Sequence, residues 1–184
     1  MSVNAPINEL NWKAPDFNLI SVDGRSYQLD DLTGKRGTVI AFICNHCPYV
    51  IKIASRLAYE ANELKKNEIS TIAIMSNDVE SYPEDSYENM KIFASKYNFK
   101  FQYLYDSSQK IAKEYKAVCT PDIYGFNSQK ILKYRGRIDS GVLKKNNKMN
   151  RDLFEAMKLI AKTNEGPAIQ YNSFGCSIKW KNNE

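Results

Sequence analysis

Two cysteines separated by two residues stand directly before a proline in the segment Cys44-Asn45-His46-Cys47-Pro48. Proline is favoured at the first position of a helix, so Cys47 is predicted to cap a helix N-terminus. Unpaired backbone N–H groups and the positive end of the helix dipole stabilise an anion there. A free cysteine has a pKa of about 8.5, and its thiolate is the reactive form. Cys47 is therefore predicted to be a nucleophile with a lowered pKa, and His46 beside it could add positive charge.

Cys44 completes a C-x-x-C spacing and has two interpretations. It is expected at the end of the preceding strand, where it could resolve a disulfide with Cys47 or serve as a small buried apolar residue. In the usual redox pair the first cysteine opens the helix and the second lies one turn inside. Here Cys47 is predicted to open the helix, and Val50 takes the inner place.

Two further cysteines are distant in the sequence. Cys119 precedes Thr120-Pro121 and is either a buried loop thiol or a neighbour of the site. The second interpretation requires a cis bond before Pro121, and about 5–6% of X–Pro bonds are cis. Cys176 lies in a polar and aromatic tail, where it is a mobile resolving thiol or a docked tail residue. As resolving partners of Cys47 we expect Cys44 first, Cys119 second and Cys176 third, because a tail loses conformational entropy when it is ordered.

The elements that must position these residues alternate between strands and helices. Apolar residues at Val50, Ile53, Leu57, Ala61 and Leu64 have the spacing of one helical face. Strands are predicted at 17–20, 26–29, 38–43, 69–75, 101–105, 122–127 and 131–134, and helices after Pro48, around 90–97, 111–115 and 153–161. Asp23-Gly24 is a hairpin signal between the first two strands. This order predicts an α/β fold in which helices flank both faces of a mixed central sheet, with an N-terminal hairpin extension.

Length and composition exclude several classes of protein. The chain has 184 residues, which suits one domain, expected at 15–184 after a leader at 1–14. The net charge of +5 is small, and its densest cluster (Lys144, Lys145 and Lys148) lacks interleaved aromatic residues, so no nucleic acid is expected as a partner. No apolar run approaches the roughly 20 residues of a membrane span. With no secretory signal either, we expect a cytoplasmic protein whose four cysteines serve redox chemistry or bind metal.

Several spaced motifs resemble one family over residues 15–181. The opening Ala14-Pro15-Asp16-Phe17, Asp23-Gly24 and Gly34-Lys35 resembles redoxin domains, which comprise the alkyl hydroperoxide reductase / thiol-specific antioxidant (AhpC/TSA) and thioredoxin-like proteins. The peroxiredoxin-like subgroup is recognised in the segments 42–50, 77–78, 82–86, 118–122, 134–139 and 175–180. The resemblance implies a thioredoxin fold, with Cys47 as nucleophile and Pro121 as a cis-proline beside it. It also implies that Thr120, and Cys119 next to it, are raised into the site.

The chain departs from the peroxiredoxin pattern Pro-x-x-x-Thr-x-x-Cys. Cys44 stands at the Thr place and Ile40 at the Pro place, and Thr120-Pro121 replaces the segment that supplies an arginine. Arg135 and Arg137 are the nearest arginines in the sequence.

We therefore expect a thiol oxidoreductase that exchanges disulfides with protein or small-molecule thiols, without a cofactor or bound metal. Reduction of hydroperoxides is the alternative activity. Two hypotheses from other classes are a metal-binding module that uses Cys44, His46, Cys47 and one distant cysteine, and a scaffold whose cysteines are only structural. The presence of one histidine and one close cysteine pair argues against a structural zinc site.

Overall fold

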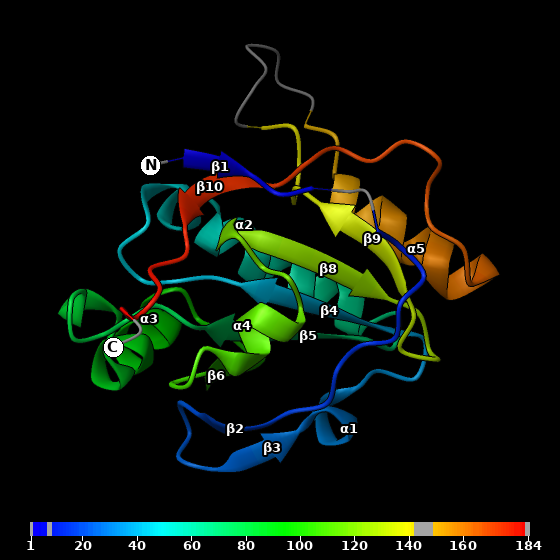
Figure 1. Cartoon of the computed structure of the whole chain (residues 1–184). Helices are drawn as coiled ribbons and strands as arrows, with labels where there is room; N and C mark the ends of the chain where they lie inside the picture. The colour runs from blue at the N-terminus through cyan, green and yellow to red at the C-terminus, as the bar shows by residue number, and fades with distance from the viewer. Residues whose placement is uncertain (1, 7–8, 142–148, 183–184) are drawn as a thin grey trace.

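A computed structural model describes residues 2–6, 9–141 and 149–182 of the chain. A central sheet runs through the molecule in the strand order β3-β2-β6-β5-β4-β8-β9 (Figure 1). Its strands are β2 (Asn18–Ser21), β3 (Ser26–Gln28), β4 (Gly37–Phe42), β5 (Ile69–Met75), β6 (Gln102–Tyr105), β8 (Asp122–Phe126) and β9 (Leu132–Gly136). Strands β4, β5 and β6 are parallel, and the other neighbours pair antiparallel. The predicted mixed sheet is thus confirmed, as is the hairpin around Asp23-Gly24. The lysine cluster at 144–148 lies outside the described residues.

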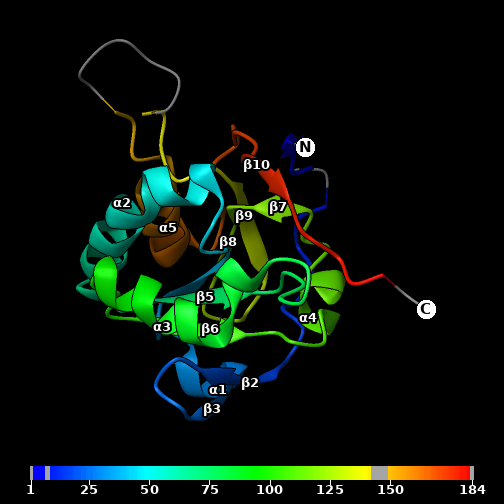
Figure 2. The ribbon, with the colours of Figure 1, turned by 90° about the vertical axis from the view of Figure 1, so that its left-hand side faces the viewer.

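Helices cover both faces of the sheet, as the alternation of elements predicts. Figure 2 shows α2 (Pro48–Lys65), α3 (Tyr87–Lys96) and α5 (Asp152–Thr163) on one side and α4 (Lys110–Glu114) on the other. Two short elements, α1 (Leu29–Leu32) and the 3-10 turn η1 (Pro83–Asp85), complete the set. The sequence pattern did not predict these two, because neither is long enough to show helical periodicity. Within the described residues, no helix is long and apolar enough to cross a bilayer.

Strand β4 is the centre of the core because alternate residues enter opposite layers. Val39 and Ala41 pack in the cluster formed with α2, α3 and α5. Ile40 and Phe42 pack in the cluster on the other face, with α4 and the aromatic residues of β8. All six residues of the strand are buried. Burial on both faces explains why this segment is continuously apolar, and it fixes the point at which the chain leaves the sheet toward Cys44.

A second, small sheet joins the two ends of the chain to the centre. Strand β10 (Phe174–Ser177) pairs antiparallel with β1 (Ser2–Asn4) on one side and with β7 (Cys119–Thr120) on the other. Figure 1 shows β1 and β10 side by side above the large sheet. Of the two interpretations of Cys176, the docked tail residue is therefore the one that the structure shows. Backbone pairing holds it, and such pairing leaves little hydrophobic periodicity in the sequence.

The segment 1–14, expected to be a leader, also contacts the domain where it is described. It carries β1, and Lys13 forms a bridge with Ile131. The ring of Trp12 packs edge-on against Tyr115, with 5.7 Å between ring centroids. These contacts are made by the backbone and by one aromatic ring, which a search for periodic apolar residues does not detect.

Candidate active site

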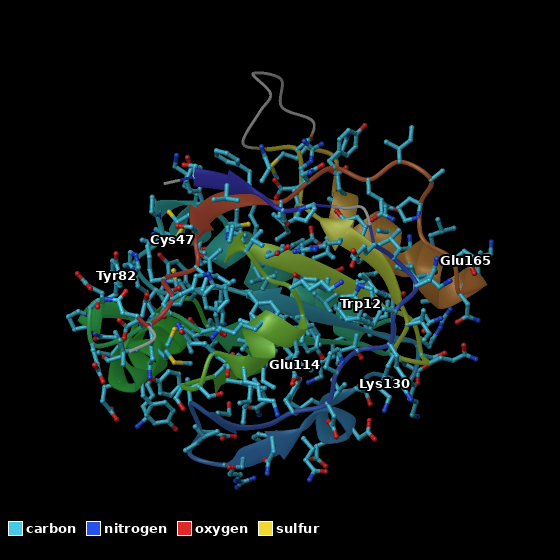
Figure 3. The ribbon with its side chains drawn as sticks, in the orientation of Figure 1. Trp12, Cys47, Tyr82, Glu114, Lys130 and Glu165 are labelled. Carbon is cyan, nitrogen blue, oxygen red and sulfur yellow. The ribbon has the colours of Figure 1, made fainter. Side chains whose placement is uncertain are left out.

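Cys47 lies where a buried strand gives way to a long helix. Strand β4 ends at Phe42, and helix α2 begins at Pro48 with Cys47 as its N-cap residue, as predicted. The Cys47 carbonyl accepts the N–H of Ile51 at 2.9 Å, so the first turn of the helix is closed. Cys47 and Tyr82 lie at one end of the molecule, away from Glu165 and Lys130 (Figure 3). The Cys47 side chain is fully buried.

The bond between Thr120 and Pro121 is cis, which confirms the expectation drawn from the family resemblance. The Cys47 thiol, when protonated, donates to the Thr120 carbonyl at 3.1 Å. Cys44 lies in the link between β4 and α2, two residues beyond the strand end, and its Sγ is 3.3 Å from Thr120 Oγ1. Thr120 therefore contacts both cysteines of the C-x-x-C segment. Cys119 instead directs its buried thiol to the Pro121 carbonyl, at 3.5 Å.

The tail places a third thiol beside this pair. Cys176 in β10 stands opposite Thr120 in the register with β7, and Ser177 stands opposite Cys119. Cys176 contributes to the lowered pKa of the Cys47 thiol. Three of the four thiols, those of Cys44, Cys47 and Cys176, are thus gathered around Thr120. We expected the tail cysteine to swing into the site at an entropic cost, but the strand pairing already holds it there.

The electrostatic environment separates the thiols by their acidity. Interaction with Cys44, and then with Cys176 and the Val50 N–H, lowers the pKa of the Cys47 thiol against the opposing effect of burial. The same interaction with Cys47, together with burial, raises the pKa of Cys44 well above its ordinary value. Burial raises the pKa of Cys119. Burial and the contact with Cys47 raise the pKa of Cys176 to about 11. The directions of these shifts favour Cys47 as the thiolate of the cluster, in line with its position at the helix N-cap.

A buried carboxylate, which the sequence reasoning did not identify, holds the turn that contains both cysteines. Asp85 in η1 is fully buried, and its Oδ1 accepts the backbone N–H groups of Asn45 (2.7 Å) and His46 (3.2 Å). Its Oδ2 lies 2.7 Å from Nδ1 of His46 and accepts Nδ2 of Asn77 at 2.8 Å. The His46 ring is stacked on Tyr82. Pro83 in the short motif 82–86 marks the turn that carries Asp85, but no spacing in the sequence links this motif to Cys44 or Cys47.

The side chains that could ligate a metal here are already engaged with each other. The ligand atoms of Cys44, His46 and Asp85 lie within 4.8 Å of one another. The Asp85 carboxylate, however, is surrounded by the four N–H or ring nitrogen partners given above. A cation would have to displace the contact between His46 and Asp85, so the donor set fits a hydrogen-bonded turn better than a metal centre.

Arg135 and Arg137, the arginines that follow the cis-proline most closely in the sequence, form ion pairs with carboxylates. Arg135 is buried against Asp122, with N–O distances of 2.8 Å and 3.3 Å, and it also donates to the Lys116 carbonyl. Nε of Arg137 lies 2.6 Å from Asp152. Each guanidinium is thereby engaged with a carboxylate remote from Cys47 in the sequence.

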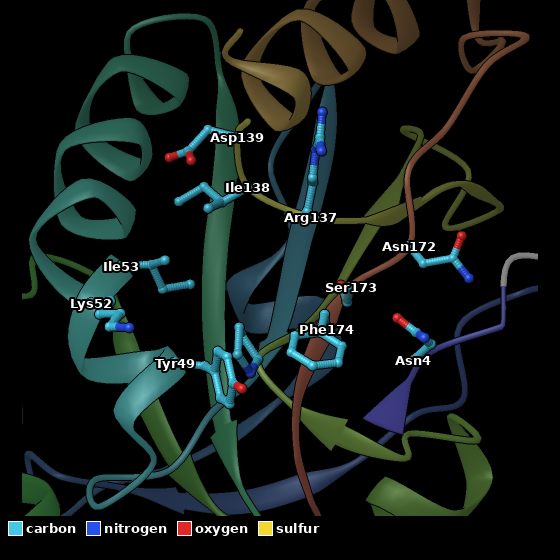
Figure 4. Close-up of a pocket in the computed structure, with 11 residues that line it drawn as sticks. Asn4, Tyr49, Lys52, Ile53, Arg137, Ile138, Asp139, Asn172, Ser173 and Phe174 are labelled. Carbon is cyan, nitrogen blue, oxygen red and sulfur yellow. The ribbon is translucent and has the colours of Figure 1, made fainter. Parts of the chain in front are cut away.

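A cavity of about 330 Å³ adjoins the cis-proline. Pro121 lines it, as do Tyr49 and Ile53 from the first two turns of α2 and Phe174 from β10 (Figure 4). The rings of Tyr49 and Phe174 meet edge to face, with 5.1 Å between centroids. The remaining lining residues are Asn4, Lys52, Arg137, Ile138, Asp139, Asn172 and Ser173. The cavity therefore offers aromatic and aliphatic walls next to the cis-proline, with polar groups at the rim.

Comparison with solved structures gives two neighbours that match almost the whole chain. An uncharacterized conserved protein from Geobacillus kaustophilus is 40% identical, with a TM-score of 0.92, over 100% of this chain and 98% of its own. A hypothetical protein from Sinorhizobium meliloti 1021 is 32% identical, with a TM-score of 0.89, over 98% of each chain. Neither description states an activity. No curated protein sequence matches the chain.

More distant neighbours establish the fold. A secreted disulfide oxidoreductase from Mycobacterium tuberculosis is 20% identical, with a TM-score of 0.53, over 63% of this chain and 79% of its own. Structural neighbours of this kind are thioredoxin-fold redoxins, peroxiredoxins and thiol-disulfide oxidoreductases. The fold is therefore the thioredoxin fold, as the resemblance implies. Residues 10–138 match the AhpC/TSA family, which is well over half of the chain. The chain thus belongs to the AhpC/TSA family.

Proposed function

We propose that the protein is a thiol-disulfide oxidoreductase in which Cys47 is the nucleophile and Cys44 is the resolving thiol. One observation carries the proposal: at the N-terminus of α2, the thiols of Cys44 and Cys47 both contact Thr120 of the cis-proline loop. Pro121 and Thr120 form the wall against which the cysteines pack. Family membership supports redox chemistry of thiols in general.

The reaction proceeds in two exchanges. The Cys47 thiolate attacks one sulfur of a substrate disulfide, which forms a mixed disulfide and releases the first substrate thiolate. The sulfur of Cys44 then attacks Sγ of Cys47 and releases the second substrate thiolate, which takes the proton of Cys44. Two cysteine thiols are oxidised to a Cys44–Cys47 disulfide, and one substrate disulfide is reduced to two thiols. In the cytoplasm, the location we propose, a dithiol reductant or glutathione would return the pair to the reduced state.

The geometry makes Cys44 suitable for the second exchange. A disulfide requires Cα atoms within roughly 7 Å and converging Cβ vectors. Three residues across a strand-to-helix turn can meet this distance, and the approach of both thiols to Thr120 supports convergence of the two side chains. The apolar cavity lined by Tyr49 and Phe174 would hold an apolar group of the substrate next to the reacting sulfur.

Reduction of hydroperoxides is the second candidate, because the family includes thiol peroxidases in addition to disulfide exchangers. In that reaction the Cys47 thiolate takes one peroxide oxygen to become a sulfenic acid, an alcohol or water leaves, and a second thiol forms a disulfide with loss of water. The residues at the peroxide-positioning places argue against it. Cys44 replaces the threonine, and Arg135 and Arg137 are paired with carboxylates.

Steady-state turnover distinguishes the candidates. Purified protein is assayed with glutathione as reductant and either a small aromatic disulfide or hydrogen peroxide as substrate. We expect disulfide turnover that Cys47→Ser abolishes and that Cys44→Ser slows sharply, because the Cys44–Cys47 disulfide can no longer form. Cys119→Ser is the matched control, because its thiol faces the Pro121 carbonyl, and it should keep wild-type turnover. Retention of turnover in Cys47→Ser would refute the assignment. Faster turnover of peroxide than of disulfide would establish the second candidate.

A further inference from the structure

The two proposed catalytic thiols are closed off from solvent. The exposed fraction is 1% for Cys44 and 0% for Cys47. Cys119 is also fully buried. Cys176 is the one cysteine of the four that is partly exposed. A dissolved disulfide therefore meets Cys176 before it can meet either sulfur of the C-x-x-C pair.

Strand β10 is the element that closes the site. It is hydrogen-bonded on both sides, to β7 through two residue pairs and to β1 through three. Gly175 lies so close to the loop that a Cβ built on it would stand 2.0 Å from the Thr120 carbonyl oxygen. The strand is thus seated directly on the cis-proline loop, and direct access to Cys47 requires it to be lifted.

The same strand presents Cys176 to both solvent and Cys47. Cys176 stands opposite Thr120, the residue whose carbonyl receives the Cys47 thiol at 3.1 Å and whose hydroxyl lies 3.3 Å from Cys44. The three sulfurs therefore form a continuous series from the surface to the interior, in the order Cys176, Cys47, Cys44.

We propose that Cys176 is a third redox-active thiol, which relays disulfide exchange between dissolved substrates and the buried Cys44–Cys47 pair. This inference rests on the proposed function of that pair. A strand that only covered the site would not need a cysteine, whereas the relay requires one in the tail strand.

The relay is balanced with a dissolved disulfide such as glutathione disulfide as the oxidant. Cys176 gives its proton to a solvent base and attacks one glutathione sulfur, and the released glutathione thiolate takes up that proton from solvent. The Cys47 thiolate then attacks Sγ of Cys176 and expels the second glutathione thiolate. The product is a Cys47–Cys176 disulfide. Cys44 then attacks Cys47, gives its proton to the departing Cys176 sulfur and leaves the Cys44–Cys47 disulfide with Cys176 as a thiol again.

The test measures the oxidation of reduced protein by glutathione disulfide, with acid quenching, alkylation and peptide mapping of every disulfide. Cys176→Ser should form the Cys44–Cys47 disulfide about tenfold more slowly or worse, because exchange must then wait for local opening of the strand. Ser177→Ala, the next residue of β10, is the matched control and should oxidise at the wild-type rate. In Cys44→Ser the Cys47–Cys176 disulfide should accumulate, and in Cys47→Ser glutathione should remain on Cys176.

Two outcomes would overturn the relay. One is wild-type oxidation by Cys176→Ser, and the other is glutathione bound to Cys47 in Cys44→Ser while Cys176 stays reduced. Either can occur while Cys47→Ser lacks all turnover, so failure of the relay is separable from failure of the proposed function. A purely structural role for Cys176 would change the thermal midpoint of unfolding but not the position of the trapped glutathione.

Discussion

Replacement of Asp85 by asparagine isolates the contribution of the buried carboxylate to the active-site turn. The substitution keeps the volume and one oxygen, which can still accept the N–H groups of Asn45 and His46. The other oxygen becomes an NH₂ group that faces the donor Nδ2 of Asn77. The Asn77 amide cannot rotate freely to compensate, because its oxygen accepts the N–H of Lys179 at 2.9 Å. One buried donor therefore loses its acceptor, and two charge-assisted hydrogen bonds become neutral.

The expected loss in the free energy of unfolding follows from these contacts. An orphaned buried donor costs about 1–3 kcal/mol, and a hydrogen bond to a charged group contributes more than a neutral one. Asp85→Asn should therefore destabilise the reduced protein by about 2–4 kcal/mol. Guanidinium chloride unfolding in a reducing buffer measures this as a lower midpoint at an unchanged m-value. Glu84→Gln is the matched control, because the side chain is exposed, and it should change stability by less than about 0.5 kcal/mol. A loss below about 1 kcal/mol, or equal losses in both variants, would contradict the reasoning.

Three further predictions concern charge and closure. Because the pKa of Cys47 is lowered, its thiolate persists as pH falls below the ordinary cysteine value of about 8.5. The rate at which iodoacetamide modifies Cys47, measured by mass spectrometry, should therefore decline only at a lower pH. A midpoint of this rate at or above about pH 8.5 would contradict the prediction. Gly175→Ala should push β10 away from the Thr120 carbonyl and speed the modification of Cys47 by iodoacetamide. An unchanged rate would refute the idea that β10 covers Cys47. Arg135→Met should cost about 3–5 kcal/mol of unfolding free energy because it leaves Asp122 buried and unpaired. A double variant that also carries Asp122→Leu should recover part of this loss. Equal losses in the single and double variants would exclude a paired-charge effect.

The sequence predicts the parts of the site that depend on local rules. The proline after Cys47 marks the helix start, and the unbroken apolar run from Val39 marks a strand buried on both faces, so the position of Cys47 follows from short-range patterns. The alternation of strands and helices likewise predicts the mixed sheet. The cis bond before Pro121 could not be derived from residue types and came from the family resemblance.

The parts that were missed depend on contacts between segments that are distant in the chain. Asp85 reaches the cysteine turn from another loop, and nothing in its neighbourhood distinguishes it from an exposed acidic residue. Cys176 reaches Cys47 because backbone hydrogen bonds hold β10 between two strands, and such pairing is almost independent of side-chain pattern. Interactions of both kinds are specified by three-dimensional proximity, which spacing along a single sequence does not encode.

The small sheet also sets an order of events during synthesis. Strand β1 leaves the ribosome long before β10, so the pairing between Ser2 and Cys176 joins segments that are far apart in the sequence. Contacts of such separation form late, after the loop between them has been closed by the rest of the fold. The turn with Cys44 and Cys47 can therefore be assembled while it is still open to small thiols and disulfides. Newly made molecules should accordingly pass through a stage in which the pair exchanges directly with the glutathione pool, and the pairing of β10 ends that stage.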